Sequence, residues 1–142
     1  MRLNHPLPKM TFGVPLVALL FVGPLSAAAD DRQWSCISSH ACVSTTPCTE
    51  KPVAYSIRQS GGLVVLKAAE SEFQLLPLAP ADGAVLRAYG QPTVGQGTSS
   101  LTLFDDLTFV YSSHVSIEMN TVTGQLMGLS VSVLGTCETV VS

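Results

Sequence analysis

Apolar and polar residues alternate over much of the chain that follows residue 30. Every second residue is Val, Tyr or Ile in 53–58, and every second residue is Val, Ile or Met in 115–120. An alternation with a period of two is typical of a β-strand that buries one face. We predict further short strands at 34–36, 63–66, 73–78, 84–89, 101–104, 109–112 and 125–137.

Turn signals separate these stretches. Ser60-Gly61-Gly62 and Asp105-Asp106 are typical of tight turns between paired strands, and Pro80–Gly83 forms another turn signal. Short strands at hairpin spacing predict a mainly β fold, namely a small antiparallel β-barrel or sandwich of seven to nine strands. Helix formers at 67–70 leave a helix over Leu66–Leu76 as an alternative, although the pattern favours β structure.

Two stretches lack the alternation and are interpreted as loops. Ser38–Pro52 is rich in Ser and Thr, and Gln91–Ser100 contains Pro92, Gly95 and Gly97. Loops on a rigid β scaffold often carry binding residues. From the second loop we expect these residues to contact a partner: Thr93, Val94, Gln96 and Thr98.

The first 29 residues have the pattern of a cleavable signal peptide. Arg2 and Lys9 make the start positive, residues 12–22 are apolar, and small residues follow at Ser26–Ala29. A membrane anchor needs about 20 apolar residues, and this run is shorter. We therefore predict that 1–29 is removed and that 30–142 is a single mainly β domain, periplasmic or secreted, without stable membrane insertion.

All four cysteines lie in the predicted exported part. An even number of cysteines in a small exported domain indicates disulfides, and four cysteines allow three connectivities. We favour Cys36–Cys137, which joins the first and last strands, together with Cys42–Cys48. Because three cysteines lie within thirteen residues, Cys36 and Cys42 can also exchange partners.

His40 lies inside the cysteine cluster and raises the alternative of a metal site. The spacing is Cys36-x3-His40-x-Cys42-x5-Cys48. Structural zinc sites usually pair their ligands through shorter and more regular units, and oxidised cysteines do not bind zinc. We therefore expect no metal.

The charge balance argues against two classes of partner. Without residues 1–29 the chain keeps five of its seven Lys and Arg residues and all ten Asp and Glu residues, so its net charge is −5. Nucleic acids and anionic membranes need basic patches, which argues against both as partners. Gly95–Ser100 lacks the lysine and the third glycine of a phosphate-binding loop, and we expect no cofactor.

Ser112 and His114 are the one pair that suggests catalysis. Residues two apart on a strand share a face, and Asp105 or Asp106 would have to supply the orienting acid. The nucleophile motif Gly-x-Ser-x-Gly is absent. We expect no catalytic site and keep a small hydrolase that uses Ser112 and His114 as an alternative.

Two short motifs at the ends of the domain carry a resemblance. Trp34-Ser35-Cys36 and Gly135-Thr136-Cys137-Glu138 resemble the C-type lysozyme inhibitor family. That resemblance implies an exported β-barrel whose closing cysteine pairs with the first. The family's inhibitory Ser-Gly-x-x-Tyr type loop has no counterpart, since Ser60-Gly61-Gly62 matches only its first two residues. The layout also resembles uncharacterised small periplasmic four-cysteine proteins of Gram-negative bacteria, for which no activity is implied.

These observations predict a function class without a specific ligand. We expect a non-enzymatic periplasmic binding or interaction module with an unidentified partner, for which an envelope protein is one candidate. Inhibition of a cell-wall lytic enzyme is the alternative that the resemblance implies.

Overall fold

The computed structural model describes residues 31–141 except 45, 93–95, 121 and 123. The predicted signal peptide and the predicted contact residues Thr93 and Val94 therefore lie outside the described residues. The described part contains nine strands and no helix. Their bounds are β1 Arg32–Val43, β2 Thr49–Glu50, β3 Ala54–Ser60, β4 Leu63–Ala68, β5 Ser71–Pro77, β6 Ala84–Gly90, β7 Gln96–Phe104, β8 Thr108–Asn120 and β9 Gln125–Thr139.

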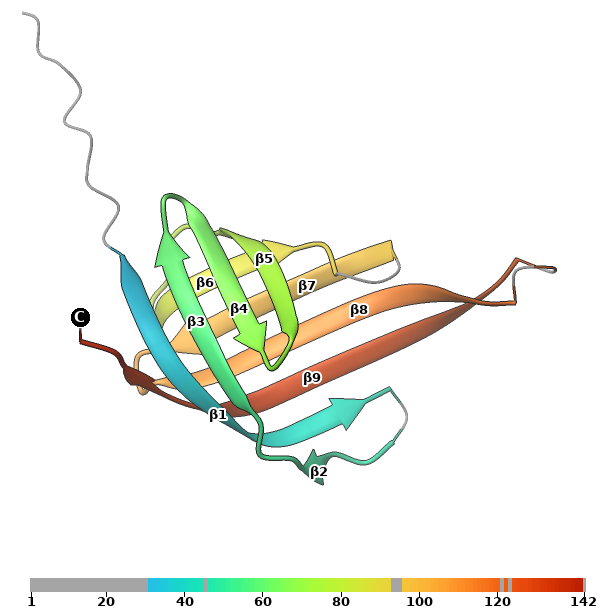
Figure 1. Cartoon of the computed structure of the whole chain (residues 1–142), viewed down its shortest axis with the longest axis horizontal. Helices are drawn as coiled ribbons and strands as arrows, with labels where there is room; N and C mark the ends of the chain where they lie inside the picture. Colours follow the sequence, from blue (N-terminus) through green and yellow to red (C-terminus); the bar gives the residue numbers. More distant parts are fainter. Residues whose placement is uncertain (1–30, 45, 93–95, 121, 123, 142) are drawn as a thin grey trace, which may run out of the picture.

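The strands form one closed antiparallel barrel. From β3 to β9 each strand pairs with the next, and β1 pairs with both β3 and β9, which closes an eight-stranded barrel. The ninth strand, β2, is an addition to the end of β1. Figure 1 shows β8 and β9 extending beyond the other strands at one end. The predicted mainly β fold is confirmed, as a barrel rather than a sandwich.

The core fills the barrel interior because every second side chain points inward. Trp34 on β1 lies opposite Ile57 on β3, and both are buried. Tyr55 and Phe109 place their ring centroids 5.7 Å apart. Further buried side chains include Val64, Leu66, Leu75, Leu86, Leu101, Leu103 and Val133.

Tight turns connect the strands where the sequence predicts them. Gly61 and Gly62 have φ angles of 57° and 82° between β3 and β4, a left-handed pair that glycine adopts easily. In the β7–β8 turn, Asp106 Oδ1 accepts hydrogen bonds from the backbone N–H (2.9 Å) and the hydroxyl (2.6 Å) of Thr108. These bonds hold the pKa of the exposed Asp106 carboxyl below its ordinary value.

Three local predictions are wrong. The loop predicted over Ser38–Pro52 begins later, because β1 continues to Val43. The loop predicted over Gln91–Ser100 ends earlier, because β7 already begins at Gln96. The alternative helix over Leu66–Leu76 is replaced by β4, a turn and β5. Pairing with neighbouring strands overrides the weak local preferences in all three cases.

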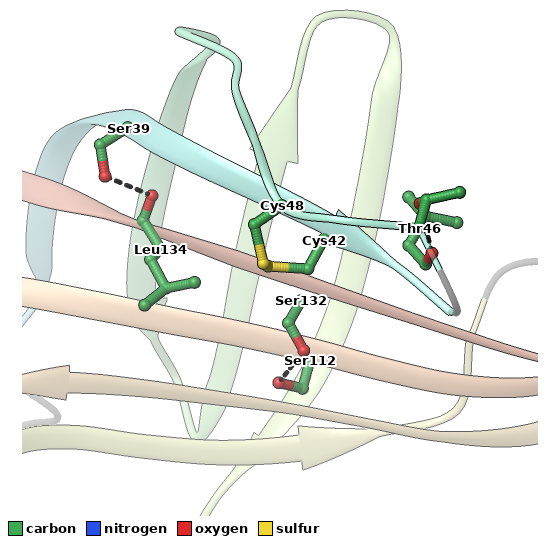
Figure 2. The surroundings of a disulfide bond; sticks show 8 residues. Ser39, Cys42, Thr46, Cys48, Ser112, Ser132 and Leu134 are labelled. Carbon is green, nitrogen blue, oxygen red and sulfur yellow. Dashed lines mark hydrogen bonds between the residues drawn. A yellow bond between two sulfur atoms is a disulfide. The ribbon is translucent and has the colours of Figure 1, made fainter.

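The two disulfides join the cysteines that the sequence analysis favours. Cys36 and Cys137 are buried and directly opposite each other in β1 and β9. Cys42 joins Cys48 beside the β1–β2 connection, where Cys48 is exposed (Figure 2). Two such bonds indicate an oxidising environment. In the described part, no helix is long and apolar enough to cross a membrane.

Candidate functional site

Beside the starts of β4 and β7, a groove lies over strands β5 and β6. The two strands are paired only through Leu76 with Tyr89 and Pro77 with Ala88. The hollow has a volume of about 490 Å³ and is called the groove below. Its lining consists of Leu63, Gln74, Leu75, Leu76, Tyr89, Gly90, Gln91, Gly97 and Thr98.

Close approach of β6 to β5 forms one wall of the groove. A Cβ atom on Gly90 would lie 2.8 Å from the carbonyl oxygen of Gln74 and from a methyl group of Leu75. Only glycine therefore allows the two strands to come so near at this point. Beside it, Leu76 and Tyr89 form a cross-strand pair whose side chains remain 51% and 48% exposed.

The lining of the groove is apolar with a few neutral polar groups. Gln74, Gln91 and Thr98 supply amide and hydroxyl groups, and no side chain in the lining carries a charge. Binding sites for small groups commonly combine an apolar surface with a few hydrogen-bonding side chains. This chemistry suits an uncharged group that has both an apolar part and a polar part.

A second hollow, called the trough below, lies on the outward face of β7, β8 and β9. Its volume is about 540 Å³, and it is wide open. His114 lies opposite Thr98 on β7 and Ser130 on β9. The end of β1 borders the trough, because Ser44 N–H donates to the carbonyl of Ser130 at 2.7 Å. The lining consists of Ser44, Gln96, Gly97, His114, Val115, Ser116, Gly128, Leu129 and Ser130.

The candidate catalytic residues are not assembled into a triad. Ser112 Oγ shares a hydrogen bond of 3.1 Å with Ser132 Oγ (Figure 2). Asp106 lies in the β7–β8 turn, six residues before Ser112, which corresponds to roughly 20 Å along a strand. Its carboxylate is occupied by Thr108. Asp105 lies in the same turn, one residue farther from Ser112 along the chain, so neither aspartate is placed to orient His114 as a general base.

A hydrogen-bonded chain of hydroxyl groups lies inside the barrel and was not predicted. Ser99 Oγ donates to Ser113 Oγ at 3.0 Å, and Tyr111 OH donates to Ser99 Oγ at 3.3 Å. All three residues are buried. Burial, with a smaller contribution from Tyr111, raises the pKa of nearby Tyr55 above its ordinary value. Each of these three hydroxyls has a partner, so the chain satisfies its own polar atoms, whereas the buried Oε1 of Gln59 has no hydrogen-bond partner.

The two described contact residues of the predicted loop lie on strand β7. Gln96 lines the trough and Thr98 lines the groove, while Gly97 between them belongs to both linings. A Cβ atom on Gly97 would lie 1.8 Å from the carbonyl oxygen of His114. This glycine therefore marks a close approach of two strands, whereas the sequence analysis interpreted it as a loop signal.

The projecting end of the β8–β9 hairpin is the third exposed feature. We call residues Ile117–Asn120 of β8 and Gln125–Leu129 of β9 the arm. Leu126 and Met127 in the arm are 67% and 41% exposed. From Leu107 to Cys137 the chain contains one charged side chain, Glu118, whereas charged residues make up 12% of the whole chain.

Comparison with known proteins gives no further guidance. The chain matches no family model, no curated protein and no solved structure. Within the described ranges, no group of three or more His, Cys, Asp or Glu residues is placed to hold a metal ion. The lysozyme-inhibitor resemblance remains a prediction from the sequence, and the functional argument depends on the groove, the trough and the arm.

Proposed function

We propose that this chain is an exported, non-enzymatic binding module whose groove takes an uncharged, partly apolar segment of an envelope protein. The observation that carries the proposal is the groove itself, with its exposed Leu76–Tyr89 pair and its three neutral polar side chains. A volume of about 490 Å³ falls within the usual range for sites that bind small groups.

The architecture around the groove supports this role. The barrel is closed by β1 and β9, and the Cys36–Cys137 bond joins these two strands, so the groove walls belong to a rigid frame. Exposed tyrosine side chains are enriched at interfaces because they combine a large apolar area with a hydroxyl group. The two disulfides suit an oxidising compartment, and the N-terminal pattern makes the periplasm the proposed location.

The test is capture of partners from the cell envelope by the tagged protein, with cross-linking and mass spectrometry. Replacing the aromatic anchor in Tyr89→Ala should lower the recovery of a saturable partner by about tenfold or more. Ile37→Ala is the matched control, since Ile37 is 54% exposed on β1 and lies outside the groove. Equal recovery with both variants would remove the groove from the proposal.

The same experiment addresses the inhibitor alternative. If the captured protein is a muramidase, its activity is then titrated with the purified chain. Loss of muramidase activity at equimolar protein would replace the general binding proposal by lytic-enzyme inhibition. Full activity at excess protein would exclude inhibition of that enzyme.

A further inference from the structure

In the arm, one edge of β9 has no neighbouring strand among the residues that the structure describes. Strand β1 pairs with β9 from Thr139 to Val131, and the last described contact is the one between Ser44 and Ser130. Beyond this point no described strand lies beside Gln125–Leu129 on that edge, whereas β8 pairs with it on the other. Figure 1 shows the arm projecting past the end of β1. Natural proteins normally protect such an edge with Lys, Pro or a bulge. Gln125–Leu129 contains neither Lys nor Pro, and the register shift in the arm lies in β8, between Glu118 and Asn120.

The Ser44–Ser130 contact fixes which backbone groups face the open edge. The carbonyl of Ser130 accepts from Ser44 N–H at 2.7 Å, and Ser130 N–H donates to Ser44 Oγ at 3.1 Å. Both backbone groups of Ser130 therefore point toward β1. Because consecutive residues of a strand point these groups to opposite edges, Leu126 and Gly128 also present theirs on the open edge. The backbone groups of Met127 point to Ile117 on β8.

From this edge we infer that the arm binds a second copy of this chain, by antiparallel pairing of the two β9 strands about a two-fold axis at Met127. In this register Leu126 of each copy lies opposite Gly128 of the other, and these pairs exchange about four N–H···O bonds. A two-fold interface requires self-complementary surfaces. Where one residue of the first copy contacts a second residue of the other copy, the second residue of the first copy contacts the first residue of the other.

The side chains fit this register. Leu126 is 67% exposed, while a Cβ atom on Gly128 would meet no heavy atom within 4 Å. Gly128 also lines the trough, so the protruding leucine of one copy lies beside open space on the other. Met127, 41% exposed on the opposite face, meets Met127 of the second copy directly. The interface is short, so we expect a weak and concentration-dependent dimer.

Charge favours the β9 edge over the β8 edge for pairing of two copies. The predicted mature chain has a net charge of −5, so two copies repel each other wherever charged surfaces meet. The β9 edge carries no charge from Gln125 to Leu129. Pairing through β8 would instead place the Glu118 carboxylates on neighbouring strands. With β9 pairing, the two β8 strands that carry Glu118 are three strand spacings apart, about 14 Å. This distance is longer than the electrostatic screening length at physiological salt.

A cross-linking experiment tests the register. Two residues at the two-fold axis form a non-hydrogen-bonded pair with Cα atoms about 4.5 Å apart, which suits a disulfide. Met127→Cys should therefore oxidise to a covalent dimer at least about tenfold faster than Leu78→Cys. Leu78 is the matched control because it is also 41% exposed and lies outside the arm. Equal rates for the two variants would overturn the register.

Sedimentation velocity from micromolar to millimolar protein tests the association itself. The wild-type chain and Leu78→Glu should show the same reversible dimer, whereas Met127→Glu should remain a monomer because two like charges would lie opposite each other. A monomeric wild type over the whole range, or a dimer that persists in Met127→Glu, would overturn the inference. The groove lies outside this interface, so partner capture through Tyr89 is unaffected by either result.

Discussion

The strands β8 and β9 pass through two different surroundings. In the barrel body Tyr111 lies opposite Val133, and each side chain is 5% exposed. In the arm the same two strands place Ile117 opposite Met127, which is 41% exposed. By register, Ile117 lies on the same face of β8 as Tyr111, and Met127 lies on the same face of β9 as Val133. The difference comes from the neighbours, because β1 and β7 accompany these strands in the body and end before the arm.

Apolar residues on the same strand face therefore have different roles in the two regions. In the body they are removed from water and stabilise the fold, by about 25 cal/mol for each Å² buried. In the arm, side chains such as Leu126 remain in water and contribute little to folding. They are instead available to another surface, as exposed apolar side chains at an unpaired strand edge commonly are.

The largest difference in stability should come from removing the two disulfides separately, one in the barrel body and one beside the β1–β2 connection. Cys36→Ala/Cys137→Ala opens a bridge with a sequence separation of 101, and the chain-entropy model gives a loss of about 4.7 kcal/mol in the free energy of unfolding. Cys42→Ala/Cys48→Ala opens a bridge with a sequence separation of 6 and should lower the free energy of unfolding by about 2 kcal/mol. Urea denaturation followed by Trp34 fluorescence measures both. Equal losses would show that the barrel does not depend on the β1–β9 closure.

A smaller difference in the free energy of unfolding is expected when a leucine is replaced by alanine in the barrel body and in the arm. Leu103→Ala leaves a cavity at a fully buried position and should lower the free energy of unfolding by roughly 2–5 kcal/mol. Leu126→Ala in the arm should change it by less than about 0.5 kcal/mol. The measurement is urea denaturation at low protein concentration, where the proposed dimer is dissociated. A loss of several kcal/mol in Leu126→Ala would mean that the arm is part of the folding core.

The sequence predicts the fold well because alternation and turn signals are local. The alternation at 53–58 and 115–120 falls on β3 and β8, and the glycines after Ser60 form the β3–β4 turn. The candidate helix over Leu66–Leu76 was wrong since helix propensity at 67–70 is worth little against strand pairing. Ala69 in this stretch instead adopts a φ of 48° in the β4–β5 turn.

The candidate surfaces were beyond the sequence because they depend on where neighbouring strands end. The sequence around Gly97 predicts a loop, yet this glycine lies where the backbone of β7 approaches His114. The groove gathers residues from β4, β5, β6 and β7, which lie far apart in the sequence, and no local pattern encodes their meeting. The low charge from Leu107 to Cys137 is the sequence signal for an exposed edge that another strand could pair with. It can be interpreted in this way only because β1 ends before the arm.

Amide hydrogen exchange along β9, measured by NMR at two protein concentrations, tests the central comparison most directly. At low concentration the amides of Leu126 and Gly128 should exchange quickly, while those of Val131, Val133 and Cys137 are protected. At high concentration Leu126 and Gly128 should become protected, because the second copy accepts their hydrogen bonds. If these two amides are as slow as Val133 at the lowest concentration, the arm has no open edge and the account is contradicted.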